Sequence, residues 1–266
     1  MSVLYSSMLI SFYSLYGVIF TEYGFAVMFL SVLICCISAV RRFPRLRVWI
    51  PYIIIIFSYE ALGGVYRAAE SIRGVFQVFR LDHAIWGFNL TGVLQSTLFS
   101  NTFTEFMIWV YALHLPLVVF SAVFLWYVSK SAYFKYLYSL VLVVLLALFT
   151  FLVMPSAPPW YTGQAVNLLT STSESGSLYH SLSSVVESDP LAAFPSLHAG
   201  LVILFVYGLW SARRIYGVLA IPIAGLVLLS TLYLGQHFMV DLIAGGIYSL
   251  SGIVFSQKLA PQIVRR

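Results

Sequence analysis

Two short stretches of the sequence place ionisable side chains inside apolar surroundings. The first reads FPSLHAG over residues 194–200. Ser196 is of a type favoured at a helix N-cap, and Pro195 is typical of a helix start. The N–H groups that open a helix can bind phosphate oxygens, and His198 could give a proton to an oxygen leaving phosphorus. By itself this stretch is a weak signal, and a capped helix with a chance histidine is the simpler interpretation.

The second stretch reads YLGQHFMVD over residues 233–241. His237 and Asp241 are four residues apart, so on a helix they share one face and can meet. A carboxylate in this position fixes the tautomer of the imidazole and stabilises its cation. The other ring nitrogen is then free to attack phosphorus and form a phosphohistidine. A structural polar pair between helices is the alternative, but ionisable residues within membrane spans are functional candidates by default.

A metal-binding transporter or receptor is a further alternative, because two histidines and one carboxylate are a plausible zinc set. The three side chains would be those of His198, His237 and Asp241. Phosphoryl transfer already explains the context of these residues, so we expect no metal and no other cofactor. Full activity in the presence of a strong chelator would remove the zinc alternative.

The composition indicates that lipid surrounds most of the chain. Of the 266 residues, 61% are hydrophobic and 9% are charged, whereas a soluble domain carries about 25% charged residues. A membrane span needs roughly 20 apolar residues. We therefore expect an all-α polytopic membrane protein with about eight transmembrane helices and no separate soluble domain. The expected spans cover residues 3–20, 23–40, 48–64, 105–128, 134–154, 196–211, 215–234 and 237–256.

The charged residues follow the positive-inside rule. Of the 14 Lys and Arg residues, eleven fall in termini and loops that the expected spans place on one side, and the nine acidic residues fall at or toward the other. We expect a multi-pass protein of the cell membrane, with both termini cytoplasmic and both motifs on the extracytoplasmic or lumenal side. Topology explains the net charge of +5 without a nucleic-acid partner. The eleven basic residues are Arg41, Arg42, Arg45, Arg47, Lys130, Lys135, Arg213, Arg214, Lys258, Arg265 and Arg266.

Two long connections separate the expected spans. Residues 65–104 are amphipathic, and we expect them to lie in the membrane interface. Arg67 and Arg73 in this segment could hold a phosphate, or could anchor the segment to lipid headgroups. Residues 155–195 are rich in Ser, Pro, Gly and Thr, which predicts an outer loop with room for one short helix.

Together, the order and spacing of the two motifs resemble the type-2 phosphatidic acid phosphatase superfamily. One complete hairpin, residues 196–234, separates them. The resemblance implies that His237 is the nucleophile, with Asp241 as its partner, and that His198 is the acid. Ser196 would contribute to phosphate binding, no metal would be needed, and the core would contain six helices.

The sequence departs from the phosphatase pattern where that pattern has cationic residues. In place of Ser-Arg before the nucleophile, this chain has Ser230 and Thr231, and it has no convincing Lys-x6-Arg-Pro block. A terminal phosphate carries up to two negative charges and a phosphodiester carries one, so the loss of cations should weaken binding of the terminal phosphate more. The departure therefore favours a diester substrate and headgroup transfer.

This departure, together with MPSAPPWY over residues 154–161, resembles the inositol phosphorylceramide synthases and their bacterial and archaeal relatives. The resemblance covers residues 48–256. It implies a six-helix catalytic core over residues 48–266. Residues 1–47 would then add two N-terminal transmembrane helices and a basic cytoplasmic loop.

We therefore predict a phosphotransferase that moves an inositol phosphate-like headgroup from a phospholipid donor to a lipid alcohol through a phosphohistidine. A lipid phosphate phosphatase or pyrophosphatase with water as the acceptor is the alternative, because only the acceptor differs. No obligate protein partner is inferred. His114 is expected about three turns into the span 105–128, where a bond to a neighbour is its simpler role. The substrate-binding candidates besides Ser196 are Arg67, Arg73, His114, Trp160 and Tyr233.

Overall fold

The computed structural model describes residues 75–171 and 191–264, and the regular elements in these residues are α-helices. This confirms the all-α prediction for the described part of the chain, whose one strand-like feature is a pair of isolated β-bridges at Ser156. In chain order the helices are α6 (Val78–Trp86), α7 (Leu90–Leu98), α8 (Asn101–Ala112), α9 (His114–Val128), α10 (Lys130–Val153), α11 (Leu168–Ser171), α13 (Leu197–Ala212), α14 (Arg214–Tyr233) and α15 (Met239–Val264).

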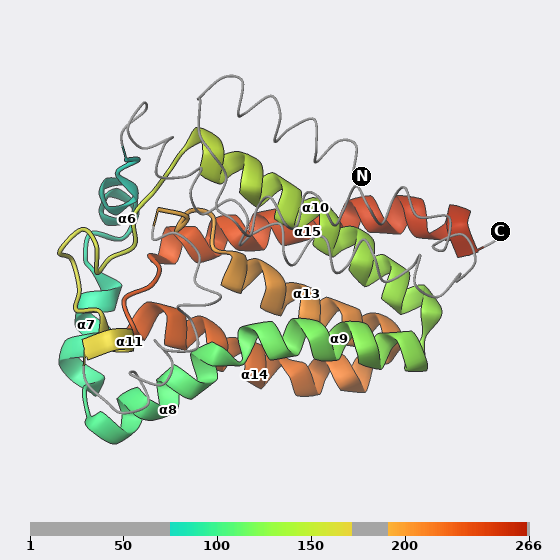
Figure 1. The fold of residues 1–266 in the computed structure, drawn as a ribbon, viewed down its shortest axis with the longest axis horizontal. Helices are drawn as coiled ribbons and strands as arrows, with labels where there is room; N and C mark the ends of the chain where they lie inside the picture. Colours follow the sequence, from blue (N-terminus) through green and yellow to red (C-terminus); the bar gives the residue numbers. More distant parts are fainter. Residues whose placement is uncertain (1–74, 172–190, 265–266) are drawn as a thin grey trace, which may run out of the picture.

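Within the described residues, four helical stretches are long and apolar enough to cross a membrane, and α13 is a shorter apolar helix. The four are Asn101–Val128, Lys130–Phe151, Arg214–Tyr233 and Met239–Lys258. With α13 they correspond to the five expected spans from residue 105 onward, and Figure 1 shows α9, α10, α13, α14 and α15 running alongside one another as a bundle. The chain is therefore a multi-pass membrane protein. The total of eight spans stays a prediction, because residues 3–20, 23–40 and 48–64, like Arg67 and Arg73, lie outside the described residues.

The expected span over residues 105–128 is divided in the structure, since α8 ends at Ala112 and α9 begins at His114. Between them, the N–H of Leu113 bonds a carbonyl three residues earlier. Pro116 explains the break, because it has no N–H to donate to the carbonyl four residues before it and its ring crowds that carbonyl. The expectation that His114 lies three turns inside a helix is therefore wrong. It lies at the bend, where α8 turns away from α9 (Figure 1).

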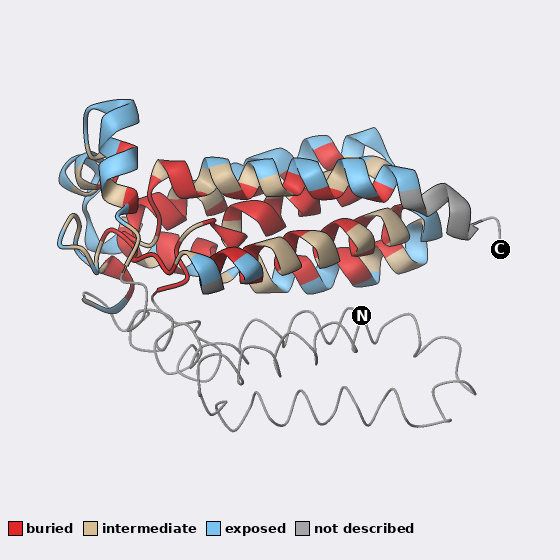
Figure 2. Cartoon of the chain, turned by 90° about the horizontal axis from the view of Figure 1, so that it is seen from above, coloured by how far each residue is buried: buried red, intermediate tan, exposed pale blue. Residues whose placement is uncertain are grey.

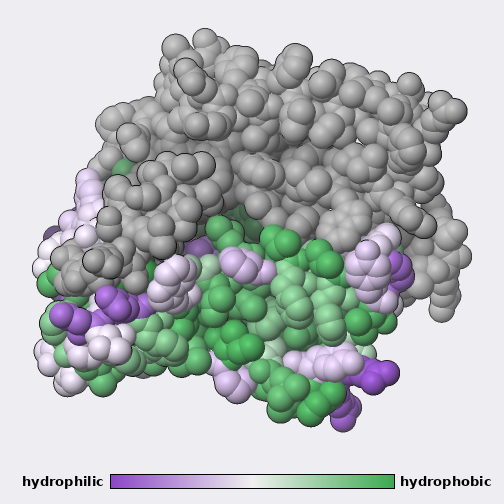
Figure 3. Space-filling model, turned by 60° about the horizontal axis from the view of Figure 1, so that its bottom comes forward, coloured by the Kyte–Doolittle hydropathy of each residue, from purple (hydrophilic) through white to green (hydrophobic). Residues whose placement is uncertain are grey.

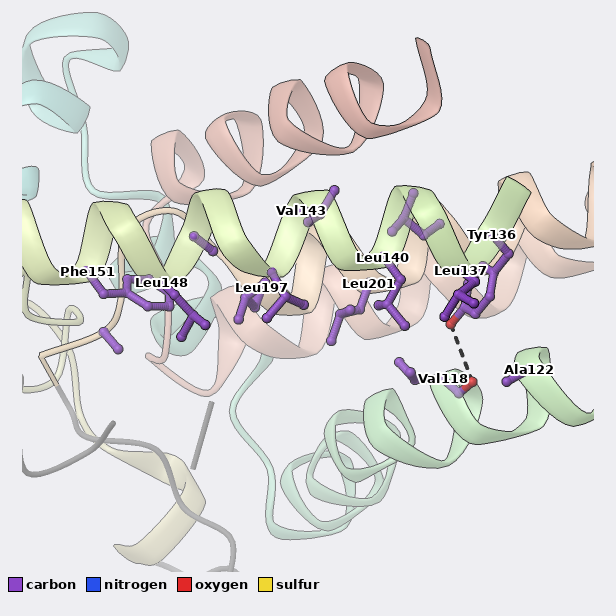
Figure 4. Packing of buried hydrophobic residues seen from close by; sticks show 14 of the residues in the cluster. Val118, Ala122, Tyr136, Leu137, Leu140, Val143, Leu148, Phe151, Leu197 and Leu201 are labelled. Atoms are coloured by element: carbon purple, nitrogen blue, oxygen red, sulfur yellow. Dashed lines mark hydrogen bonds between the residues drawn. The ribbon is translucent and has the colours of Figure 1, made fainter. Parts of the chain in front are cut away.

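Helix α13 lies at the centre of the bundle, in contact with α9, α10, α14 and α15. The largest buried cluster fills the space between α9, α10 and α13, and Figure 4 shows its side chains directed inward from these helices. Tyr136 on α10 is fully buried there, and its hydroxyl donates to the carbonyl of Val118 at 3.3 Å. The bundle is thus packed through its interior.

Large apolar side chains also cover the outside of the bundle. Phe149, Leu219 and Leu250 are 61%, 63% and 60% exposed, and Figure 2 shows exposed residues along the outward faces of helices whose inward faces are buried. On the described part of the face in Figure 3, hydrophobic residues form a broad band between hydrophilic residues at the two ends. An exposed apolar surface of this extent is unusual for a soluble protein and is the surface that lipid would cover.

A close crossing of α13 and α15 is made possible by glycine. A Cβ atom at Gly245 on α15 would overlap the carbonyl oxygen of Ser196 and would lie 3.2 Å from the N–H nitrogen of Gly200. Small residues let the backbones of membrane helices approach in this way. The hydroxyl of Ser249 then donates to the carbonyl of Gly200 at 2.8 Å. The crossing brings the first turns of α13 and α15 together.

The short helices α6, α7 and α11 gather at one end of the bundle (Figure 1). We call this the loop end, and it also contains residues 155–167 and the first turns of α13 and α15. Helices α6 and α7 come from the segment expected to lie in the interface, and α11 is a short helix within the expected outer loop. Ile85 on α6 and Phe88 after it are about half exposed, at 53% and 47%, which suits a segment at a membrane surface.

Candidate active site

Ser196 caps the start of α13 at the loop end. Its hydroxyl accepts the N–H of Ala199 at 3.2 Å, and its own N–H donates to the carbonyl of Asp241 at 3.0 Å. The expectation of an N-cap serine is confirmed, whereas Pro195 lies before the cap and not in the first turn. Because Ser196 bonds to both motifs, it joins the two stretches that the sequence separates by a hairpin.

The second motif adopts a turn followed by a helix, and not one continuous helix. Helix α15 begins at Met239, so His237 precedes it and the expectation that it shares a helix face with Asp241 is wrong. Asp241 lies in the first helical turn, and its Oδ2 accepts the N–H of Phe238 at 2.8 Å. A carboxylate that reaches back to the residue before the helix satisfies an N–H that the helix leaves unpaired. This bond fixes the carboxylate beside the preceding histidine.

The turn that carries His237 is constrained by its backbone. Gly235 has φ of +82°, and a Cβ there would lie 2.7 Å from the carbonyl oxygen of Val166. The N–H groups of Gln236 and His237 both donate to the carbonyl of Thr231, at 3.0 and 3.3 Å. Glycine is needed because the positive φ and the close approach both exclude a side chain.

The three predicted catalytic side chains meet in one row. Nδ1 of His237 lies 3.5 Å from Oδ2 of Asp241, and Nε2 of His237 lies 3.2 Å from Nδ1 of His198. His237 is 5% exposed and Asp241 is fully buried. The first contact is longer than a well-formed hydrogen bond, while the second lies within hydrogen-bonding range.

The atoms that face the ring nitrogens of His237 favour one assignment of the protons in this row. The ionised carboxylate of Asp241 can only accept, so we assign the His237 proton to Nδ1. Nε2 of His237 then carries a lone pair, and Nδ1 of His198 must donate to it. In the described residues, three buried polar atoms of the row have no hydrogen-bond partner, namely Nε2 of His198, Nδ1 of His237 and Oδ1 of Asp241. Buried polar groups are normally paired, and a catalytic role is one explanation for these exceptions.

Aromatic rings from the bend between α8 and α9 pack against His198. The ring of Tyr111 stacks on it with centroids 4.5 Å apart and planes at 29°, and the ring of His114 lies 4.0 Å away. Nδ1 of His114 bonds to the carbonyl of Tyr111 at 2.8 Å. His114 therefore has the neighbour bond expected of it and also reaches the site.

Residues 77–255, more than half of the chain, match the model of the family described as PAP2 superfamily. The chain belongs to the PAP2 superfamily. Members of this superfamily are phosphatases and phosphotransferases, so the chain is an enzyme of that general type.

A stretch of 63 residues is 38% identical to sphingosine-1-phosphate phosphatase 1 of Rattus norvegicus. This stretch makes up 23% of the chain and 15% of that protein, so the chain spans only a small part of that relative. No solved structure matches the chain.

In this PAP2 superfamily chain, two predicted substrate-binding residues support the turn before His237. The indole N–H of Trp160 donates to Oε1 of Gln236 at 3.2 Å. Tyr233 is fully buried, and its hydroxyl bonds to that of Thr104 at 2.7 Å. These contacts explain both residues structurally. Their binding of substrate stays a prediction, as it does for Arg67 and Arg73, which lie outside the described residues.

Asp82 on α6 is a supporting residue of this PAP2 site that the sequence analysis did not assign. It is 3% exposed, and its Oδ1 accepts the N–H of Val240 at 2.9 Å. Burial raises the pKa of the Asp82 carboxyl, and the N–H groups of Val240 and Met239 lower it in part. A lone acid in an amphipathic segment gives no sign that its partner lies 158 residues further along the chain.

Metal ligation was the third possibility for the triad. Within residues 75–171 and 191–264, no group of three or more His, Cys, Asp or Glu side chains is arranged to hold a metal ion. In the PAP2 site, His198 and His237 direct ring nitrogens at each other at 3.2 Å.

Proposed function

We propose that the chain is a membrane lipid phosphotransferase that moves an inositol phosphate-like headgroup from a phospholipid to a lipid alcohol through a phosphohistidine. The row Asp241, His237 and His198 carries this proposal, with Nε2 of His237 directed at Nδ1 of His198 across 3.2 Å. A nucleophile aligned by a carboxylate, with an acid facing it, is the arrangement that covalent phosphoryl transfer requires.

In the first step, the donor phosphate displaces the hydrogen bond between Nδ1 of His198 and Nε2 of His237 and enters between the two rings. The freed Nε2 lone pair attacks the donor phosphorus and forms an N–P bond. The bond from phosphorus to the oxygen of the leaving lipid alcohol breaks, and His198 gives that oxygen a proton. Asp241 stabilises the positive charge that develops on the His237 ring.

In the second step, the hydroxyl of the acceptor lipid gives its proton to His198. Its oxygen forms the new bond to phosphorus while the N–P bond breaks and returns the electron pair to Nε2. The two histidines end the cycle as they began it.

The absence of a cation at position 231 supports a diester substrate. Thr231 is fully buried, and its hydroxyl donates to the carbonyl of Leu228 at 2.8 Å, so it is not directed at an anion. Apart from Arg80 on α6, the Lys and Arg residues at described helix ends belong to the end opposite the triad: Lys130, Lys135, Arg213, Arg214 and Lys258. Among the described residues, the site is therefore poorly supplied with the charge that a dianionic phosphate monoester would need.

A lipid phosphate phosphatase or pyrophosphatase is the second candidate. The similarity to sphingosine-1-phosphate phosphatase 1 favours it. The first step would be the same, and water would replace the lipid alcohol in the second.

The test uses purified full-length protein with two substrates in parallel. One is a headgroup-labelled phosphoinositide with a lipid alcohol acceptor, and the other is phosphatidic acid. The variants are His237→Ala and Asp241→Asn, and the matched control is His83→Ala, which removes an exposed imidazole from α6. We expect a labelled acceptor lipid with the wild type and with His83→Ala, and none with His237→Ala.

Two outcomes would contradict parts of this proposal. Release of inorganic phosphate from phosphatidic acid, without transfer to the lipid alcohol, would make the enzyme a phosphatase. Full activity in His237→Ala or Asp241→Asn would refute the mechanism for both acceptors.

A further inference from the structure

We propose that His114 is a positioning residue for the acid form of His198, an inference that rests on the proposed function. The bend at Leu113 makes His114 the first residue of α9 and places its ring centroid 4.0 Å from that of His198. His114 is thereby a third histidine of the site, contributed by an element that carries neither catalytic motif.

The hydrogen bond of His114 determines which of its nitrogens is available. Its Nδ1 lies 2.8 Å from the carbonyl oxygen of Tyr111, which can only accept, so Nδ1 carries the proton. In the neutral ring, Nε2 is then a hydrogen-bond acceptor. The bond also fixes the plane of the ring, because it ties the side chain to the backbone of the preceding helix.

The proposed reaction requires a hydrogen-bond acceptor beside His198. To release a proton from Nδ1 and remain a neutral ring, His198 must begin the step with a second proton on Nε2. In the described residues, Nε2 of His198 is buried without a hydrogen-bond partner. His114, whose ring centroid lies 4.0 Å from that of His198, can offer a lone pair, and hydrogen bonds from charged donors are the stronger ones.

Tyr111 supports the same protonation state from the other helix. Its ring stacks on that of His198 at 4.5 Å with planes at 29°, and the face of an aromatic ring attracts a cation. The titratable groups that face His198 are therefore Tyr111 from α8, His114 from α9 and His237 from the turn before α15, with Asp241 behind His237. His114 must stay neutral in this arrangement, since a second cation would repel the first.

The experiment compares His114→Phe, which keeps a ring without nitrogen, with His114→Gln, which restores an acceptor oxygen. His83→Phe is the matched control on α6. We measure kcat and KM against pH, using whichever of the two substrates the wild type turns over. We expect His114→Phe to lower kcat by about tenfold or more with little change in KM, as a general acid contributes about 10²- to 10⁴-fold in all.

The pH profile separates positioning from a structural role. Loss of the acceptor disfavours protonated His198, so the alkaline limb of kcat should move to lower pH in His114→Phe and partly return in His114→Gln. An unmoved limb in His114→Phe, or no return in a folded His114→Gln, would overturn the proposal. If His114→Phe fails to fold, kcat and the alkaline limb of His114→Gln are compared with those of the wild type. His114→Asn is then the variant without an acceptor, because its side chain is too short to reach His198. An unaltered kcat and alkaline limb in His114→Asn would refute the proposal.

The proposed function can fail separately. A wild type that turns over neither substrate would refute the phosphotransferase and its phosphatase alternative together. If the wild type is active and the alkaline limb of kcat does not move in His114→Phe, only the role of His114 is refuted.

Discussion

His237 and His198 have different proposed roles because different atoms face their rings. His237 has a carboxylate on its Nδ1 side, which leaves the Nε2 lone pair for attack, whereas His198 faces that lone pair with its Nδ1 and has rings on its flank. The distinction between nucleophile and acid follows from these contacts. Neither role is a property of the side chain alone.

The role of His198 predicts a dependence on the leaving group. His198→Ala should slow transfer from a phospholipid by about 10²- to 10⁴-fold, because a lipid alkoxide leaves poorly without a proton. The loss should be far smaller for a nitrophenyl phosphodiester, whose leaving group needs no acid. Rates of the wild type and the variant on both donors measure the effect. Equal losses on the two donors would contradict the role of acid.

At the scale of the elements, the site depends on how closely α13 and α15 approach each other. Ser196 bonds to the carbonyl of Asp241 across this crossing, and Gly245 is the residue that permits it. Helix α6 acts on the same place from outside, since Asp82 accepts the N–H of Val240 at the start of α15. The positions of the catalytic side chains are therefore set by contacts between helices.

The crossing predicts the effect of adding one methyl group. Gly245→Ala should destabilise the protein by about 1–3 kcal/mol, as overpacking of a tight interior does, and should lower activity by separating His198 from His237. Gly225→Ala on α14 is the matched control, because a Cβ there meets nothing within 4 Å. Thermal unfolding in detergent and turnover of both variants give the comparison. An unaffected Gly245→Ala variant would show that the helices can move apart without cost.

The buried Asp82 predicts a dependence of stability on pH. Burial raises its pKa above the ordinary 3.8, so the folded protein binds this proton more tightly than the unfolded chain does. Its contribution to stability is therefore fully present below the unfolded pKa and is lost as pH rises through the folded pKa. Asp82→Asn keeps an acceptor for Val240 but cannot titrate. The difference in unfolding midpoint, wild type minus Asp82→Asn, should rise as pH is lowered from 7 to 4, and a fall would contradict this account.

In the whole molecule, the catalytic residues lie at one end of the bundle, and most of the described Lys and Arg residues lie at the other. The triad, Asp82 and Trp160 lie at the loop end, whereas α10 starts with Lys130 and α14 with Arg214 at the opposite end. On the described part of the face in Figure 3, an apolar band lies between the ends. With the positive-inside rule, this arrangement predicts that the loop end faces away from the cytoplasm.

Cysteine labelling tests this orientation. In a chain with Cys35 and Cys36 replaced by alanine, Tyr161→Cys reports on the loop end and Tyr127→Cys on the opposite end. Both positions are exposed, at 49% and 82%. We expect an impermeant thiol reagent added to intact cells to label Tyr161→Cys and to reach Tyr127→Cys only after lysis. The reverse pattern would place the active site in the cytoplasm.

Features that depend on a local pattern could be predicted from the amino-acid sequence. The apolar runs predicted the five described spans, because a span consists of consecutive apolar residues, although the run over residues 105–128 is divided into α8 and α9. The N-cap at Ser196 was likewise readable, since its partner is three residues away. The proximity of His237 to Asp241 was predicted too, but it comes from the turn before α15 and not from a shared helix face.

The contacts that join distant segments became known from the three-dimensional structure. It broke the span at Leu113 and so brought His114 to His198, it placed Asp82 against Val240, and it showed Gly245 to be the point of closest approach between α13 and α15. Each of these depends on where two separated helices pack. Packing is fixed by the fit of whole surfaces, for which a single stretch of sequence carries no local signal.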